Sequence, residues 1–162
     1  MKKLMLLLFV FAGITVNAQF SIGGGLSYLG DAGVEVNSVF SMGETMSLSP
    51  SIDYYFPGED MTRLAVNVDG HYNLGDPDSM NYYPIAGLNY YYFSYDMPVI
   101  SYEGVTYGGG SFSDGQIGLN LGFGASYVLS DSMKFYGDLR YVMNDYSDDL
   151  GIALGILFTL GN

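Results

Sequence analysis

The chain has 162 residues, which is enough for one domain, and its 17 acidic residues outnumber its five basic residues to give a formal net charge of −12. Such a charge argues against nucleic-acid binding and leaves divalent cations as plausible counter-ions. The absence of cysteine excludes disulfides and thiolate metal sites.

The N-terminus has the pattern of a secretory signal peptide. Two lysines precede an apolar run over residues 4–14, and Val16 and Ala18 supply the small residues of a cleavage site. The run is shorter than the roughly 20 residues that a membrane helix requires. We therefore expect a signal peptide over residues 1–18 and a single domain over residues 19–162. Cleavage would leave Arg63, Lys134 and Arg140 against 17 acidic residues, a net charge of −14.

The remaining chain consists of segments of about ten residues with alternating polarity, separated by turn residues, which is the signature of a membrane β-barrel. Apolar side chains occupy one face of each segment, and Gly, Ser, Asn or charged residues occupy the other. The expected strands are 20–29, 34–42, 46–56, 63–74, 82–93, 116–129, 133–143 and 150–160. Eight strands predict an all-β, antiparallel, up-and-down transmembrane barrel.

The closing strand, 150–160, shows the pattern best. Its even positions are large and apolar, whereas its odd positions are Gly, Ala, Gly, Leu and Thr. The alternative is a soluble sandwich or lipocalin-like barrel, but its water-facing side should then carry many more Lys and Glu residues. The sequence thus favours strands that face lipid.

Connection lengths predict the orientation, because bacterial barrels have short periplasmic turns and longer outer loops. The connections 30–33, 57–62, 94–115 and 144–149 are longer on the whole than 43–45, 75–81 and 130–132. With the N-terminus in the periplasm, the longer set lies outside the cell. Nine acidic residues fall in that set: Asp31, Glu59, Asp60, Asp96, Glu103, Asp114, Asp145, Asp148 and Asp149.

Two aromatic girdles are expected where such a barrel meets the membrane interfaces. The outer girdle comprises Tyr28, Tyr54, Phe56, Tyr90, Tyr92 and Tyr141. The periplasmic girdle comprises Phe20, Tyr72, Tyr82, Tyr127, Phe135 and Phe158.

The signal peptide, the eight alternating segments and the apolar last strand together resemble the small outer-membrane β-barrel family, which includes outer membrane protein X and the barrel domain of outer membrane protein A. The resemblance covers residues 19–162. It implies a compact barrel in the outer membrane of a Gram-negative bacterium that contributes to envelope integrity, adhesion or host contact. Members usually end in an aromatic residue that the barrel assembly machinery reads. Here the last outward residues are Phe158 and Leu160, followed by Gly161 and Asn162.

Seven titratable side chains are expected to point into the barrel. A charge in so narrow a lumen must be paired or hydrated, and side chains of an eight-stranded barrel meet across its axis. We therefore expect an internal polar plug in which Arg140 bridges some of the carboxylates, with a small ion-conducting pore as the alternative. The plug residues are Glu35, Asp53, Asp69, His71, Lys134, Asp138 and Arg140.

Two further patterns bear on activity. His71 and Asp69 share one strand face and resemble half of a serine-hydrolase triad, but one strand cannot establish a catalytic geometry. The long connection 94–115 contains an alternating stretch around a predicted hairpin turn, so its flanking strands are expected to project and offer an edge for strand addition. Its candidate contact residues are Tyr102, Glu103, Gly104 and Tyr107.

The sequence thus predicts a monomeric, non-enzymatic outer-membrane barrel with a structural or adhesion-like role. A lipid A-modifying enzyme and an ion pore are the alternatives. No catalytic, cofactor or metal site is expected. The expected partners are membrane lipid and lipopolysaccharide, the barrel assembly machinery and an unidentified extracellular ligand, but no nucleic acid.

Overall fold

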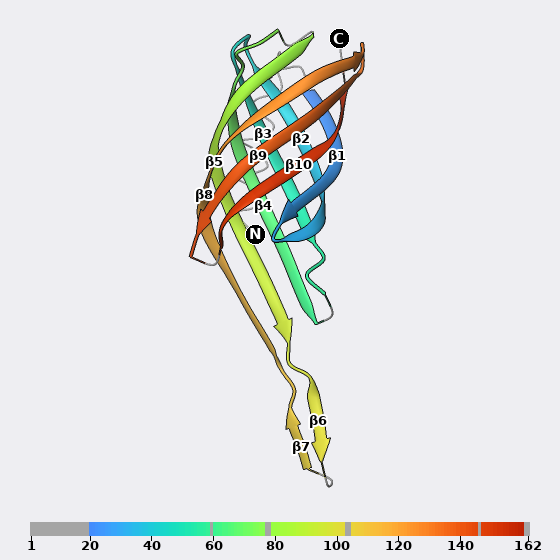
Figure 1. Cartoon of the computed structure of the whole chain (residues 1–162), viewed down its shortest axis with the longest axis vertical. Coiled ribbons are helices and arrows are strands. Elements are labelled where there is room, and N and C mark those ends of the chain that lie inside the picture. Colours follow the sequence, from blue (N-terminus) through green and yellow to red (C-terminus); the bar gives the residue numbers. More distant parts are fainter. Residues whose placement is uncertain (1–19, 59, 77–78, 103–104, 146, 161–162) are drawn as a thin grey trace, which may run out of the picture.

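Eight strands form a closed antiparallel barrel, and two more form a hairpin beyond it (Figure 1). The computed structural model describes residues 20–58, 60–76, 79–102, 105–145 and 147–160. The predicted signal peptide therefore lies outside the described residues. The barrel strands are β1 (Phe20–Leu29), β2 (Asp31–Met42), β3 (Met46–Tyr55), β4 (Met61–Tyr72), β5 (Met80–Asp96), β8 (Ser111–Ser130), β9 (Met133–Asn144) and β10 (Ser147–Leu160). The hairpin strands are β6 (Val99–Tyr102) and β7 (Val105–Gly108).

The barrel closes through the first and last strands. β1 pairs with β10 from Phe20↔Leu160 to Tyr28↔Ile152, and every other neighbouring pair is also antiparallel. The backbone groups along the seam thereby find partners within the barrel, as a membrane-spanning structure requires. The predicted eight-stranded fold is confirmed.

The alternation of side chains also follows the prediction. Large apolar residues such as Leu26 and Leu154 are exposed on the outer wall, whereas the polar residues between them are buried in the lumen. No helix in the described part of the chain is long and apolar enough to cross a membrane. The apolar outer wall is where a soluble barrel would present polar side chains, so it supports the membrane interpretation.

Two predicted connections are shorter in the structure than the sequence indicated. The turn expected over 30–33 shrinks because β2 begins at Asp31, which pairs with Leu29. Gly30 alone reverses the chain, with a φ of 73° that a side chain would disfavour. The connection expected over 94–115 shrinks because β5 and β8 remain paired out to Asp96↔Ser111.

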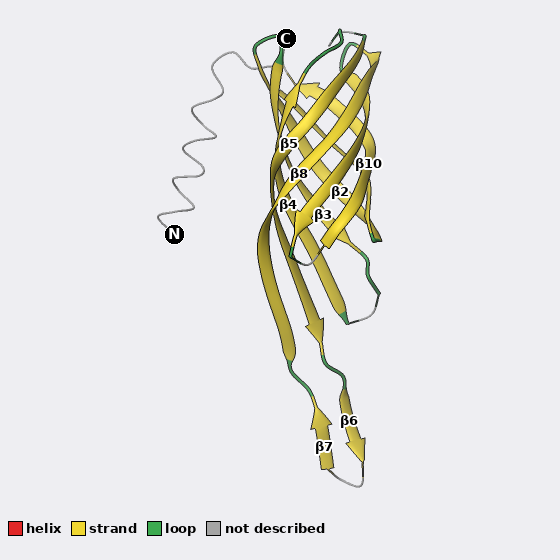
Figure 2. Cartoon of the chain, turned by 60° about the vertical axis from the view of Figure 1, so that its left-hand side comes forward, coloured by secondary structure: helices red, strands yellow, loops and turns green. Residues whose placement is uncertain are grey.

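Residues 90–96 of β5 and 111–117 of β8 remain paired and form a two-stranded ribbon, which projects well beyond the rest of the barrel (Figure 2). The β6–β7 hairpin extends it, at the end of the molecule opposite the C-terminus (Figure 1). Tyr102 and Val105, the residues that flank the predicted turn, are paired. Glu103 and Gly104 lie outside the described residues.

Candidate functional site

The lumen is filled by a cluster of buried polar side chains, which we call the polar cluster: Glu35, Asp53, Asn67, Asp69, Asn89, Asn120, Tyr136, Asp138 and Arg140, with Tyr83. They come from β2, β3, β4, β5, β8 and β9, whose inward faces meet at the barrel axis. Small residues opposite them make room. A methyl group at Gly87 would lie 2.1 Å from Asp69 Oδ1, and one at Gly124 would lie 2.2 Å from Asp138 Oδ1.

Arg140 lies at the centre of the polar cluster. Its Nη2 donates to Glu35 Oε2 at 2.7 Å, and its Nη1 donates to Asp69 Oδ2 at 3.2 Å. Asp53 Oδ1 is 4.0 Å from Nη2, too far for a hydrogen bond. One guanidinium on β9 thus connects carboxylates on β2 and β4 across the axis.

Neutral side chains extend this arrangement. Tyr136 donates its hydroxyl to Glu35 Oε1 at 2.8 Å, and Asn120 donates to Asp69 Oδ1 at 2.9 Å. Asn120 also donates to Asn67 at 3.0 Å and accepts from Asn89 at 2.8 Å. The alternation of the strands places these amides and Tyr136 on the inward faces, but only their three-dimensional contacts reveal that they belong to the network.

The remaining three predicted lumen residues are Asp138, Lys134 and His71. Asp138 accepts a hydrogen bond from the Tyr83 hydroxyl at 2.8 Å. Lys134 is half-buried and, with His71, lines a cavity of about 60 Å³ in the half of the lumen away from the β6–β7 hairpin. Tyr83 was not predicted to be part of the site, because tyrosines occur on both faces of its strand.

His71 does not form the hydrolase-like pair with Asp69. It is buried and stacks on Tyr83, with ring centroids 4.4 Å apart and planes 10° apart. Both carboxylate oxygens of Asp69 accept hydrogen bonds from other residues, Asn120 and Arg140. His71 therefore contributes to packing within the lumen.

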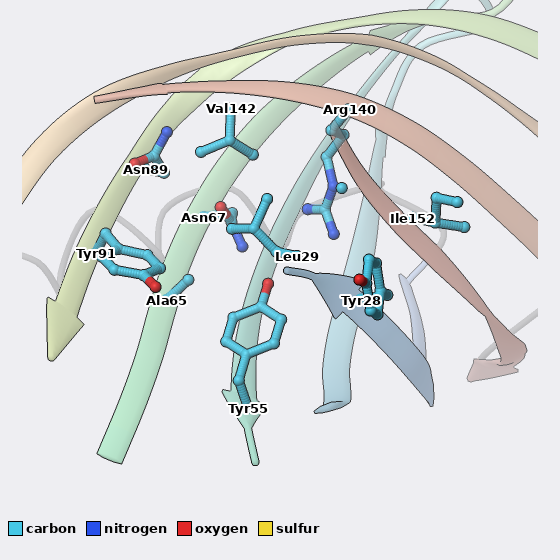
Figure 3. A pocket seen from close by; sticks show the side chains of 11 residues that line it. Tyr28, Leu29, Tyr55, Ala65, Asn67, Asn89, Tyr91, Arg140, Val142 and Ile152 are labelled. Atoms are coloured by element: carbon cyan, nitrogen blue, oxygen red, sulfur yellow. The ribbon is translucent and has the colours of Figure 1, made fainter. Parts of the chain in front are cut away.

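Apolar side chains pack on both sides of the polar cluster. Toward the end that carries the β6–β7 hairpin, which we call the outer end, one layer comprises Leu29, Tyr55, Ala65, Tyr91 and Val142. Only about 10 Å³ of free space remains between this layer and Arg140 (Figure 3), room for roughly one water molecule. Toward the opposite end, Ala153 and Leu157 pack against the ring of Tyr136 from the polar cluster.

An ion pair covers the outer layer. The Arg63 guanidinium binds the Asp31 carboxylate and the Tyr91 hydroxyl. It also lies over the rings of Tyr91 and Tyr55, 5.2 Å and 5.9 Å from their centroids. The outer mouth is thus closed by apolar packing beneath a paired charge.

The aromatic residues expected in the girdles lie near the strand ends. Ten of the twelve are exposed on the outer wall, whereas Tyr92 and Phe20 are half-buried. Phe20 packs against Phe40 with ring centroids 4.9 Å apart. Tyr54 and Phe56 make an edge-to-face pair at 5.4 Å.

The ribbon is a second candidate site because one edge of it is open. β8 pairs with β9 only from Leu119↔Met143 onward, whereas its pairing with β5 continues to Ser111. Residues 111–117 are therefore paired on one side only among the described residues. At the foot of this edge lies a surface groove of about 530 Å³, lined by Ile117, Gly118, Leu119, Met143, Asn144, Asp145 and Asp148.

Comparison with known proteins identifies the family. Residues 3–157 match the family model described as outer membrane protein beta-barrel domain. No curated protein sequence matches the chain.

Among solved structures, the chain is similar to a major outer membrane protein of Thermus thermophilus, with a TM-score of 0.70 and 18% identity over 89% of this chain and 100% of that one. The N-terminal β-barrel domain of Pseudomonas aeruginosa OprF gives a TM-score of 0.67 and 16% identity over the same shares. Ail, the attachment invasion locus protein of Yersinia pestis, gives 0.56 and 13% over 88% and 97%. The chain therefore belongs to the outer membrane protein beta-barrel domain family, and it is a small barrel of the Gram-negative outer membrane.

Proposed function

We propose that this protein is a non-enzymatic outer-membrane barrel whose projecting ribbon binds an extended, basic polypeptide segment at the cell surface. The observation that carries the proposal is the edge of β8 over residues 111–117, where the strand is laddered to β5 and, among the described residues, β9 does not reach it. Free backbone N–H and C=O groups along such an edge can accept an added strand.

The ribbon's side chains support a role in contact. Within the barrel, the even positions of β5, such as Leu88 and Tyr90, are exposed on the outer wall. Beyond the barrel, the two faces of β5 exchange polarity. The face that continues the outer wall carries the polar residues Ser94 and Asp96, and the face that continues the lumen carries the apolar residues. The exposed apolar residues there are Tyr95, Met97, Val99 and Phe112, with 38% to 62% of their surface accessible.

Charge favours a basic partner. The described acidic residues at the outer end are Asp31, Asp60, Asp96, Asp114, Asp145, Asp148 and Asp149. Arg63 is the one described cation at this end, and Asp31 already pairs with it. Two of the acids, Asp145 and Asp148, line the groove at the foot of the open edge. A strand carrying Lys or Arg would therefore be attracted to this edge, whereas an acidic strand would be repelled.

The closed lumen supports a structural role over conduction or catalysis. The apolar layer around Leu29 lies on one side of the polar cluster, and the cavity there has room for about one water molecule. On the other side Ala153 and Leu157 pack against Tyr136, next to the cavity of about 60 Å³. His71 is buried inside the lumen, where lipid substrates have no access. We expect His71→Ala to leave the lipid A profile of the cell unchanged, and an altered profile would revive the enzyme alternative.

The rest of the proposal concerns assembly. We infer a monomer, because a single chain supplies every strand of the closed barrel. We further infer that cleavage follows Ala18, that the apolar wall contacts membrane lipid and lipopolysaccharide, and that the barrel assembly machinery reads the alternating end around Phe158 and Leu160.

The edge can be tested by amide hydrogen exchange on the protein in lipid nanodiscs. We expect an alternating Lys-Val peptide to slow exchange at residues 111–117, and an alternating Glu-Val peptide to have no effect. Deleting residues 98–110 removes the hairpin and should weaken attachment to cells. Unchanged exchange with both peptides would contradict strand addition, and unchanged attachment would remove the hairpin from the contact surface.

A further inference from the structure

The Asp53 carboxyl group is fully buried in the lumen, and only one of its oxygens is hydrogen bonded. Oδ2 accepts from Asn67 Nδ2 at 2.7 Å. Oδ1 has no hydrogen-bond partner among the described residues. A buried carboxylate oxygen without a donor is energetically costly, because water is lost and nothing replaces it.

The charges around Asp53 do not balance. The described titratable groups at this level of the lumen are Glu35 on β2, Asp69 and His71 on β4, Tyr83 on β5, and Tyr136, Asp138 and Arg140 on β9, with Tyr55 next to Asp53 on β3. The described inward residues of β1, β8 and β10 here are Gly, Ser, Ala or Asn. Four buried carboxyl groups thus surround one guanidinium.

Hydrogen bonding distinguishes Asp53 from the carboxyl groups that contact Arg140. Both oxygens of Glu35 accept hydrogen bonds, one of them from Arg140, and the same holds for Asp69. Asp53 accepts a hydrogen bond from a neutral amide, its other neighbouring donor is the neutral Ser27 hydroxyl, and its Oδ1 is 4.0 Å from Arg140. Of these three, Asp53 is therefore the carboxyl group for which the lumen offers the least stabilisation of a negative charge.

Glu35 and Asp53 are also direct neighbours. They are paired in the β2–β3 register, and both side chains point into the lumen. Directly opposite residues on one face have Cβ atoms about 4.5–5.5 Å apart. Two carboxylates this close in a closed lumen of low dielectric constant repel each other strongly, and such pairs commonly hold one proton between them.

We propose that the lumen binds one proton at neutral pH, held on Oδ1 of Asp53 and shared with the Glu35 carboxylate. The proton turns the unpartnered oxygen into a donor, and the neighbouring Glu35 oxygens have lone pairs left to accept it. Asp53 then carries no charge, and the Arg140 charge is left to Glu35 and Asp69. Deprotonation at alkaline pH would place two adjacent negative charges in the closed lumen and loosen the polar cluster.

Infrared spectroscopy of the folded protein in nanodiscs tests this proposal at pH 7. We expect the carbonyl stretch of a protonated carboxylic acid, which shifts in D₂O. Carboxyl-¹³C labelling of aspartate should move this band, whereas carboxyl-¹³C labelling of glutamate should move it little. This comparison needs no substitution, so it is independent of any folding defect.

Substitutions then locate the proton. Asp53→Asn keeps the shape of the protonated acid, and its amide can donate to Glu35, so this variant should fold and lack the band. The matched control Asp138→Asn should keep the band. Absence of the band in the wild type, its persistence in folded Asp53→Asn, or its loss in Asp138→Asn alone would each overturn the proposal.

Discussion

Arg140 on β9 and Glu35 on β2 form a buried ion pair at 2.7 Å, although the two residues are 105 positions apart in the sequence. The pair crosses the barrel axis, since β9 and β2 are not neighbours in the sheet. Both side chains are almost inaccessible, with 7% and 1% of their surface exposed. The interior of the barrel is therefore held together by a contact that no ladder of backbone hydrogen bonds provides.

Removing Arg140 should destabilise the barrel strongly. Arg140→Met leaves Glu35 and Asp69 without their charged partner in a closed lumen, and breaking a buried pair in this way costs about 3–5 kcal/mol. Urea unfolding in detergent micelles, followed by heat-modifiable migration on gels, measures the loss. Arg63→Met is the control, because the Arg63–Asp31 pair is more exposed and exposed pairs contribute little. Equal losses for the two variants would argue against a central role for Arg140.

Gly87 should be intolerant of a side chain. A methyl group there would lie 2.1 Å from Asp69 Oδ1 and 2.5 Å from the Val68 carbonyl oxygen. Overpacking of this kind costs about 1–3 kcal/mol. Gly70→Ala on the adjacent strand is a matched control, since its nearest contact would be 3.4 Å. The free energy of unfolding should be lower for Gly87→Ala than for Gly70→Ala. If Gly87→Ala left the stability unchanged, the polar cluster would be loosely packed.

A positive charge on the outer wall should cost more at the middle of the membrane than at its edge. Leu154 is exposed on the outer wall near the middle of β10, and Leu160 is exposed at the end of that strand. Leu154→Lys should destabilise the folded barrel in lipid by about 2–4 kcal/mol, and Leu160→Lys by about 1 kcal/mol or less. Similar values at both positions, measured by urea unfolding in lipid vesicles, would contradict the proposed placement in the bilayer.

Planar-bilayer recording should detect no reproducible channels, because the apolar layer beneath the Arg63–Asp31 pair closes the lumen on the side of the β6–β7 hairpin. Weakening the outer layer with Tyr55→Ala and Tyr91→Ala together should make conductance more frequent. Well-resolved, reproducible channels through the wild-type protein would refute the closed lumen and favour the pore.

The outer surface should not bind polysulfated sugars. A structure of Yersinia pestis Ail contains the heparin analogue sucrose octasulfate, but the outer end of this chain is acidic, with Arg63 already paired to Asp31. Isothermal titration of the protein in nanodiscs with sucrose octasulfate should give no heat of binding at physiological salt. Measurable binding that weakens with salt would show that the charge of this surface has been misjudged.

The sequence alone predicted the eight-stranded barrel, its closing strand and the inward face of most lumen residues. A period of two is a local property of the chain, and a lipid environment on one side forces nearly every outward residue to be apolar. The hairpin around residues 103–104 was also predictable, because its flanking strands alternate.

Only the tertiary structure decided which inward residues meet. The partners of Arg140, the role of Asn120 and the stacking of His71 on Tyr83 depend on how strands far apart in sequence face one another across the axis. The length of the ribbon likewise depends on pairing between β5 and β8. Residues such as Phe93 and Asp114 are paired in the sheet, but their polarity does not predict that the strands continue through them. The closing strand β10 shows both contributions. Its alternating sequence identified which side chains form the outer wall, whereas its pairing with β1 and β9 depends on the register in which the sheet closes.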